Sequence, residues 1–190
     1  MPRWAPRGSP GAGSAMKIDG LAGIAGQFDG MLIDQFGVIH DGQRLYPGTL
    51  RILTELRDAR IPVAVMTNSG KRADANRKRL IKMGVPRDCF VDAVSSGEVA
   101  FQSLSVKRAY LIGKAGEDGF DGVTFTGDPC DAEVILILGS NAPATSLDDY
   151  RELLQGLTLP AICCNPDKLM LSPQGLLPAP GAIAALYEEM

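Results

Sequence analysis

Several residue types are scarce in this 190-residue sequence, and each scarcity excludes a class of protein. It has one histidine and no C-x-x-C pair among its four cysteines, Cys89, Cys130, Cys163 and Cys164, so we expect no zinc site. The formal net charge of −3 leaves no basic excess for binding nucleic acid. No apolar run approaches the ~20 residues of a membrane helix. We therefore predict a cytoplasmic protein with small, buried, reduced thiols that binds neither nucleic acid nor membrane.

The first fifteen residues, "MPRWAPRGSPGAGSA", are rich in proline, glycine and arginine. They lack the apolar segment of a secretory signal, and their composition predicts a disordered tail over residues 1–15. The globular pattern begins at Met16. We expect either that Met16 is the biological start or that residues 1–15 are a dispensable tail. Deleting residues 1–15 should therefore leave the thermal midpoint unchanged.

Apolar strand-like runs alternate with amphipathic helical segments along the rest of the chain. The patterns predict strands at 30–34, 61–68, 88–97, 108–113, 131–140 and 160–167, and helices at 47–60, 71–84, 97–104, 146–157 and 179–190. The run at 30–34 reads as a short buried strand. Buried strands joined by helices predict an α/β protein with a doubly wound parallel sheet.

Polar residues follow three of these strands where each strand ends. They are Asp34, the pair Thr67-Asn68 and the pair Ser95-Ser96. Ligands bind at the carboxyl ends of the strands in such sheets. A carboxylate at the position of Asp34 suits a nucleophile or a magnesium ligand, and the Thr67 hydroxyl beside free helix amides suits a phosphate. The alternative for Asp34 is an ordinary turn residue.

Three segments together resemble a known family. "LIDQFGVIHDG" and "VAVMTNSGKR" resemble the first two motifs of the haloacid dehalogenase superfamily, at matching spacing. "CCNPDKLMLSPQGLLPAPGAI" is similar to the asparagine-proline-aspartate segment of the type-2 cap in the class IIA phosphatases. The resemblance spans roughly residues 17–190. It implies a Rossmann-like core over 16–103, an inserted α/β cap over 104–180, and the start of a return to the core at 181–190.

The resemblance implies a magnesium-dependent phosphomonoester phosphatase that acts on a small phosphorylated metabolite. Asp34 would be the nucleophile and a Mg²⁺ ligand, and the backbone carbonyl of Phe36 a second ligand. Thr67 would bind the transferred phosphoryl group, and Asn68 would shape the loop around it. The implied substrate-binding residues are Gly37, Ser69, Gly70, Asn165 and Asp167. Caps of this type often form homodimers in the family.

One departure from the family pattern falls two residues after Asp34. Phosphatases of the family carry a second aspartate there, which protonates the leaving group and then activates water, whereas this chain has Phe36. Losing a general acid or base costs typically about 10²–10⁴-fold in rate. His40 or Asp41 could substitute, since both lie in the following flap. The alternatives are a hinge-packing role for His40 and a tight turn at Asp41-Gly42.

A second departure concerns motifs that the family places after the cap. These are a lysine and a glycine-aspartate pair with a further aspartate; "TGDPCDAE" is superficially similar but precedes the cap's own strand. We therefore expect the core to be incomplete at its C-terminus, with the strand before Asp34 an exposed apolar edge. Two functions remain open: the phosphatase, or a catalytically impaired module that binds a phosphorylated ligand or a protein. A receiver-type signalling domain would need an acidic pair and a late lysine, and neither is found.

Overall fold

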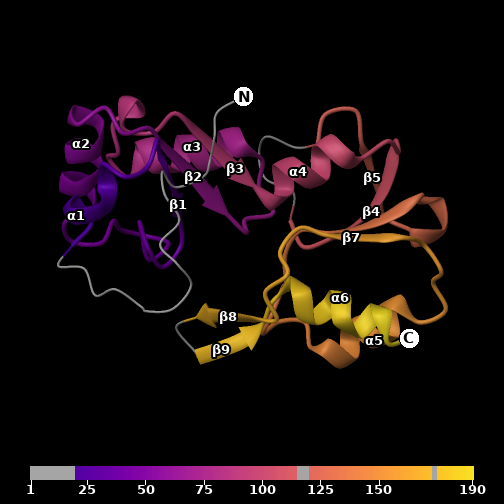
Figure 1. Ribbon diagram of the computed structural model, residues 1–190. Helices are drawn as coiled ribbons and strands as arrows, with labels where there is room; N and C mark the ends of the chain where they lie inside the picture. The colour runs from indigo at the N-terminus through magenta and orange to yellow at the C-terminus, as the bar shows by residue number, and fades with distance from the viewer. Residues whose placement is uncertain (1–19, 115–119, 173–174) are drawn as a thin grey trace, which may run out of the picture. The chain divides into compact units, whose positions relative to one another are not determined.

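The structure, a computed structural model, describes residues 20–114, 120–172 and 175–190. The predicted tail over 1–15 lies outside these residues. The chain divides into two compact units, and Figure 1 shows the helices and strands that they contain. The first comprises the described residues up to Met66 together with Arg79–Ala93, and the second comprises Thr67–Lys78 and Val94–Met190.

A three-stranded sheet follows the predicted strand positions in the N-terminal half. The elements are α1 (Ala22–Ala25), β1 (Met31–Asp34), α2 (Thr49–Asp58), β2 (Val63–Thr67), α3 (Ala73–Lys82), the 3₁₀ turn η1 (Arg87–Cys89) and β3 (Asp92–Ser95). The strand order is β1-β2-β3. Strands β1 and β2 are parallel, with Met31 opposite Val63 and Asp34 opposite Met66. The strands predicted at 30–34 and 61–68 are therefore present. The strand predicted at 88–97 is limited to Asp92–Ser95, because Arg87–Cys89 form a 3₁₀ turn and a helix begins at Ser96.

Apolar residues at helical and strand spacing form the core of the first unit. Leu53 and Leu56 lie one turn apart on α2, and Val63 and Val65 share one face of β2. All four are at most 5% exposed and pack in one cluster. Gly84 follows α3 with a positive φ of 100°, a conformation that suits glycine after a helix.

Strand β1 departs from the prediction of a buried strand. Leu32 is 54% exposed and Asp34 is also exposed, while Met31 and Ile33 are half-buried. Among the described residues, β1 pairs only with β2, so its other edge is open. The prediction of burial was wrong for Leu32, and the expectation of an exposed apolar edge is confirmed for the part of the chain that the structure describes.

The second unit contains a four-stranded, all-parallel sheet. Its elements are α4 (Ser96–Ser103), β4 (Arg108–Ile112), β5 (Thr124–Thr126), the 3₁₀ turn η2 (Pro129–Asp131), β6 (Val134–Ile137), α5 (Leu147–Leu154), β7 (Ala161–Cys163), β8 (Leu169–Ser172), β9 (Gly175–Pro178) and α6 (Pro180–Glu188). The sheet order is β5-β4-β6-β7, and β8 pairs with β9 in a separate antiparallel hairpin.

Strand β6 is buried on both faces, as a central strand of a doubly wound sheet must be. Leu136 packs on one side in a cluster with Ala100 of α4. Ile135 and Ile137 pack on the other side with residues of α5 and α6. Helices therefore cover both faces of this sheet, which confirms the predicted α/β class.

Helix α5, predicted at 146–157, begins with a capping box. The Ser146 hydroxyl accepts the Asp149 N–H, and the Asp149 carboxylate accepts the Ser146 N–H, which completes a capping box. The C-terminal helix predicted at 179–190 is present as α6.

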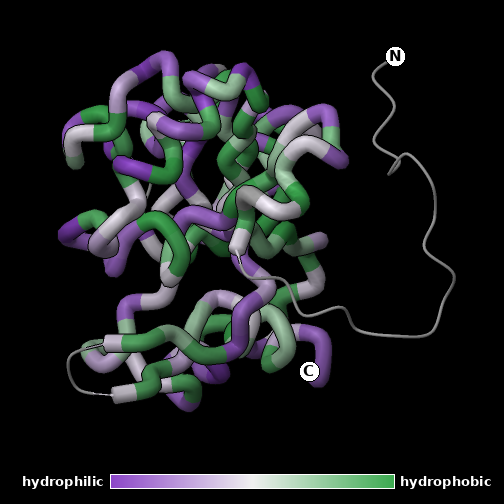
Figure 2. The backbone as a smooth tube through the Cα atoms, turned by 60° about the vertical axis from the view of Figure 1, so that its left-hand side comes forward, coloured by the Kyte–Doolittle hydropathy of each residue, from purple (hydrophilic) through white to green (hydrophobic). Residues whose placement is uncertain are grey.

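The β8–β9 hairpin and strand β5 were not predicted. Leu169, Leu171 and Leu176 are each more than half exposed, and Figure 2 shows hydrophobic residues on both hairpin strands. The run 169–178 reads as irregular because proline and glycine interrupt it. Its two strands are held by pairing with one another rather than by a periodic buried face.

The cysteine prediction is only partly correct. All four cysteines are free, and Cys89 and Cys164 are buried. Burial raises the pKa of Cys164 to about 12, so it is an inert thiol. Cys163 is half-buried, whereas Cys130 is exposed because it lies in the short turn η2. None of the helices in the described parts of the chain has both the length and the apolar character needed to cross a bilayer.

Candidate functional site

Asp34 is the last residue of β1, at the carboxyl end of the parallel sheet. Its side chain is exposed, and its Oδ1 accepts the backbone N–H of Gln35 at 2.7 Å. In register it lies opposite Met66, which directly precedes Thr67 at the end of β2. The predicted nucleophile therefore lies at the end of a strand, with its side chain exposed.

The loop that follows Asp34 folds back on itself through backbone hydrogen bonds. The Gln35 carbonyl accepts the N–H groups of Ile39 and His40, at 2.9 and 3.2 Å. The Gly37 N–H donates to the His40 carbonyl at 2.9 Å, and Gly37 has a φ of 85°, which favours glycine. This loop, residues 35–46, includes residues 37–46, for which the resemblance implies the flap, and it is called the flap below.

Phe36 and His40 pack together inside the flap. Their ring centroids are 5.9 Å apart with the planes at 87°, an edge-to-face arrangement. The Gly42 N–H donates to His40 Nδ1 at 2.9 Å, and the Arg79 guanidinium donates to the Gly42 carbonyl. The sequence gives no signal for the Arg79 contact, because the two residues are 37 positions apart.

His40 and Asp41, the two predicted substitutes for the missing acid, both accept hydrogen bonds from backbone N–H groups of the loop. Burial lowers the pKa of His40, and the positive charge of Arg79 lowers it further, against the opposing effects of Asp41 and Asp34. The backbone N–H groups of Arg44 and Gln43 both donate to Asp41 and lower its pKa. Asp41 is therefore a turn residue, in agreement with the alternative weighed from the sequence.

The segment after β2 forms a compact turn within the second unit. The Thr67 hydroxyl is buried and accepts the Ser69 N–H at 3.3 Å, and the Ser69 hydroxyl accepts the Lys71 N–H at 3.2 Å. The Ser95 hydroxyl donates to the Lys71 carbonyl at 2.6 Å and accepts the Glu98 N–H, which caps α4. Side-chain hydroxyls thus hold the 67–71 turn against the start of a helix.

Two glycines allow this turn to approach its neighbours closely. A Cβ at Gly70 would lie 2.3 Å from the Leu138 carbonyl oxygen, and one at Gly97 would lie 2.1 Å from the Gly70 carbonyl oxygen. The Gly97 N–H also donates to the Ser69 carbonyl at 3.0 Å. Backbone therefore packs on backbone here, and any larger residue would push the segments apart.

Asn68 lies close to the predicted cap motif. Its Nδ2 is 3.4 Å from both carboxylate oxygens of Asp167, to which it donates. Asn165 Oδ1 accepts the Asp167 N–H at 2.9 Å and so orients that residue. The structure thus brings together three predicted site residues that are up to 99 positions apart, although sequence reasoning assigned no contact between them.

An ion pair joins the start of α3 to the start of α4. Arg72 Nε and Nη2 donate to the two Glu98 oxygens at 2.7 and 3.2 Å, and the Ala73 N–H donates to Glu98 at 3.1 Å. Arg72 also lies 3.5 Å above the ring of Phe101. Hydrogen bonds from Arg72 lower the pKa of Glu98. Sequence reasoning missed this pair.

The residues present do not form a complete magnesium site. Cation sites in proteins are built from several oxygen ligands. Among the described residues, no group of three or more His, Cys, Asp or Glu side chains could hold a metal ion. Asp34 and the Phe36 carbonyl are the only predicted ligands, and they supply one carboxylate. This donor set alone does not fit the ion.

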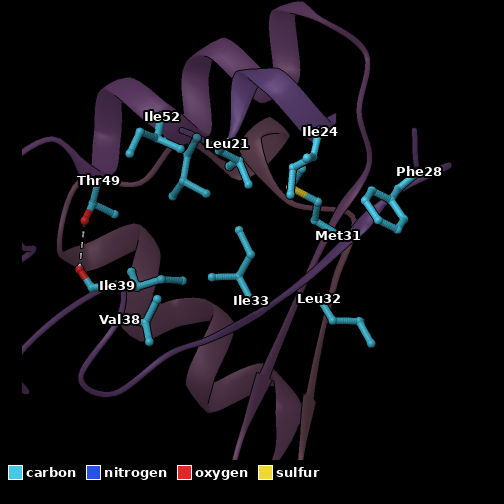
Figure 3. A pocket seen from close by; sticks show the side chains of 11 residues that line it. Leu21, Ile24, Phe28, Met31, Leu32, Ile33, Val38, Ile39, Thr49 and Ile52 are labelled. Atoms are coloured by element: carbon cyan, nitrogen blue, oxygen red, sulfur yellow. Dashed lines mark hydrogen bonds between the residues drawn. The ribbon is translucent and has the colours of Figure 1, made fainter. Parts of the chain in front are cut away.

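An apolar groove runs beside β1 (Figure 3). It has a volume of about 470 Å³ and is lined by Leu21, Ile24, Phe28, Met31, Leu32, Ile33, Val38, Ile39, Thr49, Ile52 and Leu53. The Thr49 hydroxyl donates to the Ile39 carbonyl at 3.3 Å and closes one end. Among the residues that the structure describes, no charged side chain lines the groove, so its chemistry does not suit a phosphate.

A sequence-family model of haloacid dehalogenase-like hydrolases matches residues 31–122. No curated protein matches the sequence. The fold is similar to a haloacid dehalogenase-like hydrolase from Brucella suis 1330, with a TM-score of 0.77 and 26% identity over 89% of this chain and 65% of that chain. This chain therefore spans less than two thirds of the length of that protein.

Two further solved structures share the fold at lower identity. A 4-nitrophenylphosphatase from Thermotoga maritima matches with a TM-score of 0.61 and 23% identity over 87% of this chain and 66% of that chain. A glycerol phosphate phosphatase from Mycobacterium tuberculosis, solved in complex with calcium, matches with a TM-score of 0.58 and 20% identity. The match covers 87% of this chain and 51% of that chain.

Proposed function

We propose that this chain, which belongs to the haloacid dehalogenase superfamily and has the class IIA fold, acts as a phosphomonoester hydrolase through a phosphoryl intermediate on Asp34. Its substrate would be a small phosphorylated metabolite. The matched family model and the phosphatases among the similar structures support this proposal.

The observation that carries the proposal is the position of Asp34. It ends a parallel strand, its side chain is exposed, and its register partner Met66 directly precedes Thr67. Only Oδ1 accepts a hydrogen bond from Gln35, which leaves Oδ2 available as a nucleophile.

The proposed reaction has two displacements at phosphorus. An Asp34 oxygen bonds to phosphorus as the ester oxygen leaves with its electron pair and takes a proton from solvent. Water then bonds to phosphorus, the Asp34 oxygen–phosphorus bond breaks, and the carboxylate is restored with inorganic phosphate as product. Thr67 and the 67–71 turn would bind the phosphoryl oxygens. In the cap, Asn165 and Asp167 would lie near the leaving group.

Magnesium dependence is part of the proposal. Members of the superfamily generally use a divalent metal, and one similar structure contains calcium. Asp34 and the Phe36 carbonyl would supply two ligands, and a bound Mg²⁺ would neutralise charge on the phosphoryl group. A cytoplasmic location and a homodimer formed through the cap also remain predictions.

Binding of beryllium fluoride tests the role of Asp34. Beryllium fluoride imitates a phosphoryl group on a carboxylate and can be followed by fluorine NMR in the presence of magnesium. We expect a bound signal for the wild type and for Asp148→Asn, an exposed carboxylate on α5, and none for Asp34→Asn. An equal signal in Asp34→Asn, or no signal in any of them, contradicts the proposal.

The second candidate is a module that binds a phosphorylated ligand, or a protein, without turnover. It is favoured by Phe36 in the place of an acid and by the engagement of both His40 and Asp41 within the loop. The two functions predict different results for the variant Asp34→Asn. This substitution abolishes hydrolysis under the first and leaves ligand affinity largely intact under the second.

A further inference from the structure

His40 is the most deeply buried polar side chain of the flap. It is 1% exposed and is the only histidine of the chain. Its Nδ1 accepts the Gly42 N–H at 2.9 Å, so this nitrogen carries no proton. In neutral histidine the proton then resides on Nε2, which is buried and has no hydrogen-bond partner within residues 20–114, 120–172 and 175–190. A buried nitrogen without a partner is an unusual arrangement for a group that is to exchange protons with a substrate.

The backbone of His40 contacts both the beginning and the end of the flap. Its N–H donates to the Gln35 carbonyl and its carbonyl accepts the Gly37 N–H, so it is bonded on both sides of Phe36. It also forms bridges with Phe36 and Leu45. One residue thus makes contacts along the loop from Gln35 to Leu45.

The side chain of His40 adds two contacts to this framework. Its ring meets the Phe36 ring edge to face, and its Nδ1 holds Gly42. Gly42 has a φ of 103°, and a Cβ there would lie 2.9 Å from Phe36 Cε2. Arg79 holds the same residue from α3 by donating to its carbonyl. Phe36 is therefore enclosed on one side by His40 and Gly42.

We propose that His40 is a positioning residue, whose Nδ1 holds Gly42 and fixes the flap in one conformation around Phe36, and that it does not transfer protons. This extends the proposed function, because Phe36 stands two residues after the nucleophile. Through Phe36, His40 fixes the backbone that follows Asp34. The charged groups around it are Arg79, Asp41 and Asp34.

The first test is made on the wild-type protein. Because the chain has one histidine, its imidazole nitrogens give one pair of ¹⁵N signals, which distinguish the two neutral tautomers. We expect the proton on Nε2 and an unprotonated, hydrogen-bonded Nδ1. A proton on Nδ1 overturns the proposal, and this measurement requires no variant to fold.

The second test compares two isosteric replacements of His40. In His40→Asn the side-chain oxygen can occupy the place of Nδ1 and accept the Gly42 N–H. In His40→Gln the side-chain amide occupies the place of Nε2 instead. In His40→Gln the Gly42 amide should exchange with solvent about tenfold faster, the effect of losing one hydrogen bond. In His40→Asn it should stay within about threefold of the wild type. Equal exchange in the two variants overturns the proposal.

The third test separates positioning from proton transfer. If His40 positions the loop, His40→Gln lowers kcat by the same factor for an aryl ester, p-nitrophenyl phosphate, and for an alkyl ester, glycerol phosphate. A proton donor would matter more for the alkyl ester, whose leaving group is the more basic, so a larger loss there overturns the proposal. If the wild-type protein hydrolyses neither ester, the proposed function fails, and the tautomer and exchange measurements still decide the role of His40.

Discussion

Replacement of Glu98 by glutamine tests the ion pair that holds the segment after Thr67. Glu98 accepts two hydrogen bonds from Arg72 and one from Ala73, and both charged side chains are only about a fifth exposed, at 20% and 19%. A hydrogen bond to a charged group contributes about 1.5–3 kcal/mol. Glutamine keeps one acceptor oxygen and removes the charge, so we expect a loss of about 2 kcal/mol in the free energy of unfolding.

The assay is urea denaturation at neutral pH, with thermal unfolding as a second measure. For a domain of this size, a loss of about 2 kcal/mol lowers the midpoint by roughly 4–8 °C. Glu55→Gln is the matched control, because Glu55 pairs with Arg51 at an exposed site, with side chains 61% and 71% exposed. It should cost less than about 0.5 kcal/mol. If Glu98→Gln costs no more than this control, the reasoning is refuted.

The same pair predicts a pH dependence. The pKa of Glu98 is lowered from its ordinary value of 4.5, chiefly by the hydrogen bonds from Arg72. A lowered folded-state pKa means that the unfolded chain binds the proton more readily. The stability from Glu98 is therefore complete above pH 4.5 and is lost as the pH falls through the folded-state value. Glu98→Gln should lack this loss, and an unchanged pH profile in the variant would count against the assignment.

Further predictions concern packing, the open edge and a helix cap. Gly70→Ala should cost more than about 2 kcal/mol in unfolding free energy, because its Cβ meets the Leu138 oxygen, whereas Gly127→Ala, with nothing within 4 Å, should be nearly neutral. Equal midpoints in chemical denaturation would contradict this. Leu32→Thr should change stability by less than about 0.5 kcal/mol and reduce aggregation measured by light scattering, because Leu32 is exposed on an edge strand; unchanged aggregation would argue against the edge as its source. Ser146→Ala should cost about 1 kcal/mol by loss of the α5 cap, and no change in urea midpoint would exclude that role.

Periodicity and end signals predicted most of the regular structure. The strand that ends at Asp34, the helix predicted at 146–157 and the α/β class were all found where the sequence placed them. The exposure of Leu32 could not be read from the apolar run alone, because a run of this length does not reveal how many neighbours a strand has. The exposed edge was expected only from the resemblance to the family. The β8–β9 hairpin depends on pairing between its own strands, which has no periodic signature.

The long-range contacts of the candidate site were beyond the sequence. Asp34 and Thr67 are marked by strand ends, which is a local pattern. The approach of Asn68 to Asp167 and of Arg79 to Gly42 depends on tertiary packing across 99 and 37 positions. The engagement of His40 Nδ1 depends on the loop conformation. The positions of Asp34 and Thr67 at strand ends were therefore predictable from the sequence. The long-range contacts of the neighbouring residues were not.

The most direct test of the central claim is to identify the residue that carries a phosphoryl group during turnover. The protein would be mixed with p-nitrophenyl phosphate and magnesium, quenched in acid, and mapped by peptide mass spectrometry. We predict one phosphoryl group on Asp34 that hydroxylamine removes, as expected of an acyl phosphate, and none in Asp34→Asn. A phosphoryl group on any other residue, the same adduct in Asp34→Asn, or product release with no adduct on rapid quenching would contradict the account.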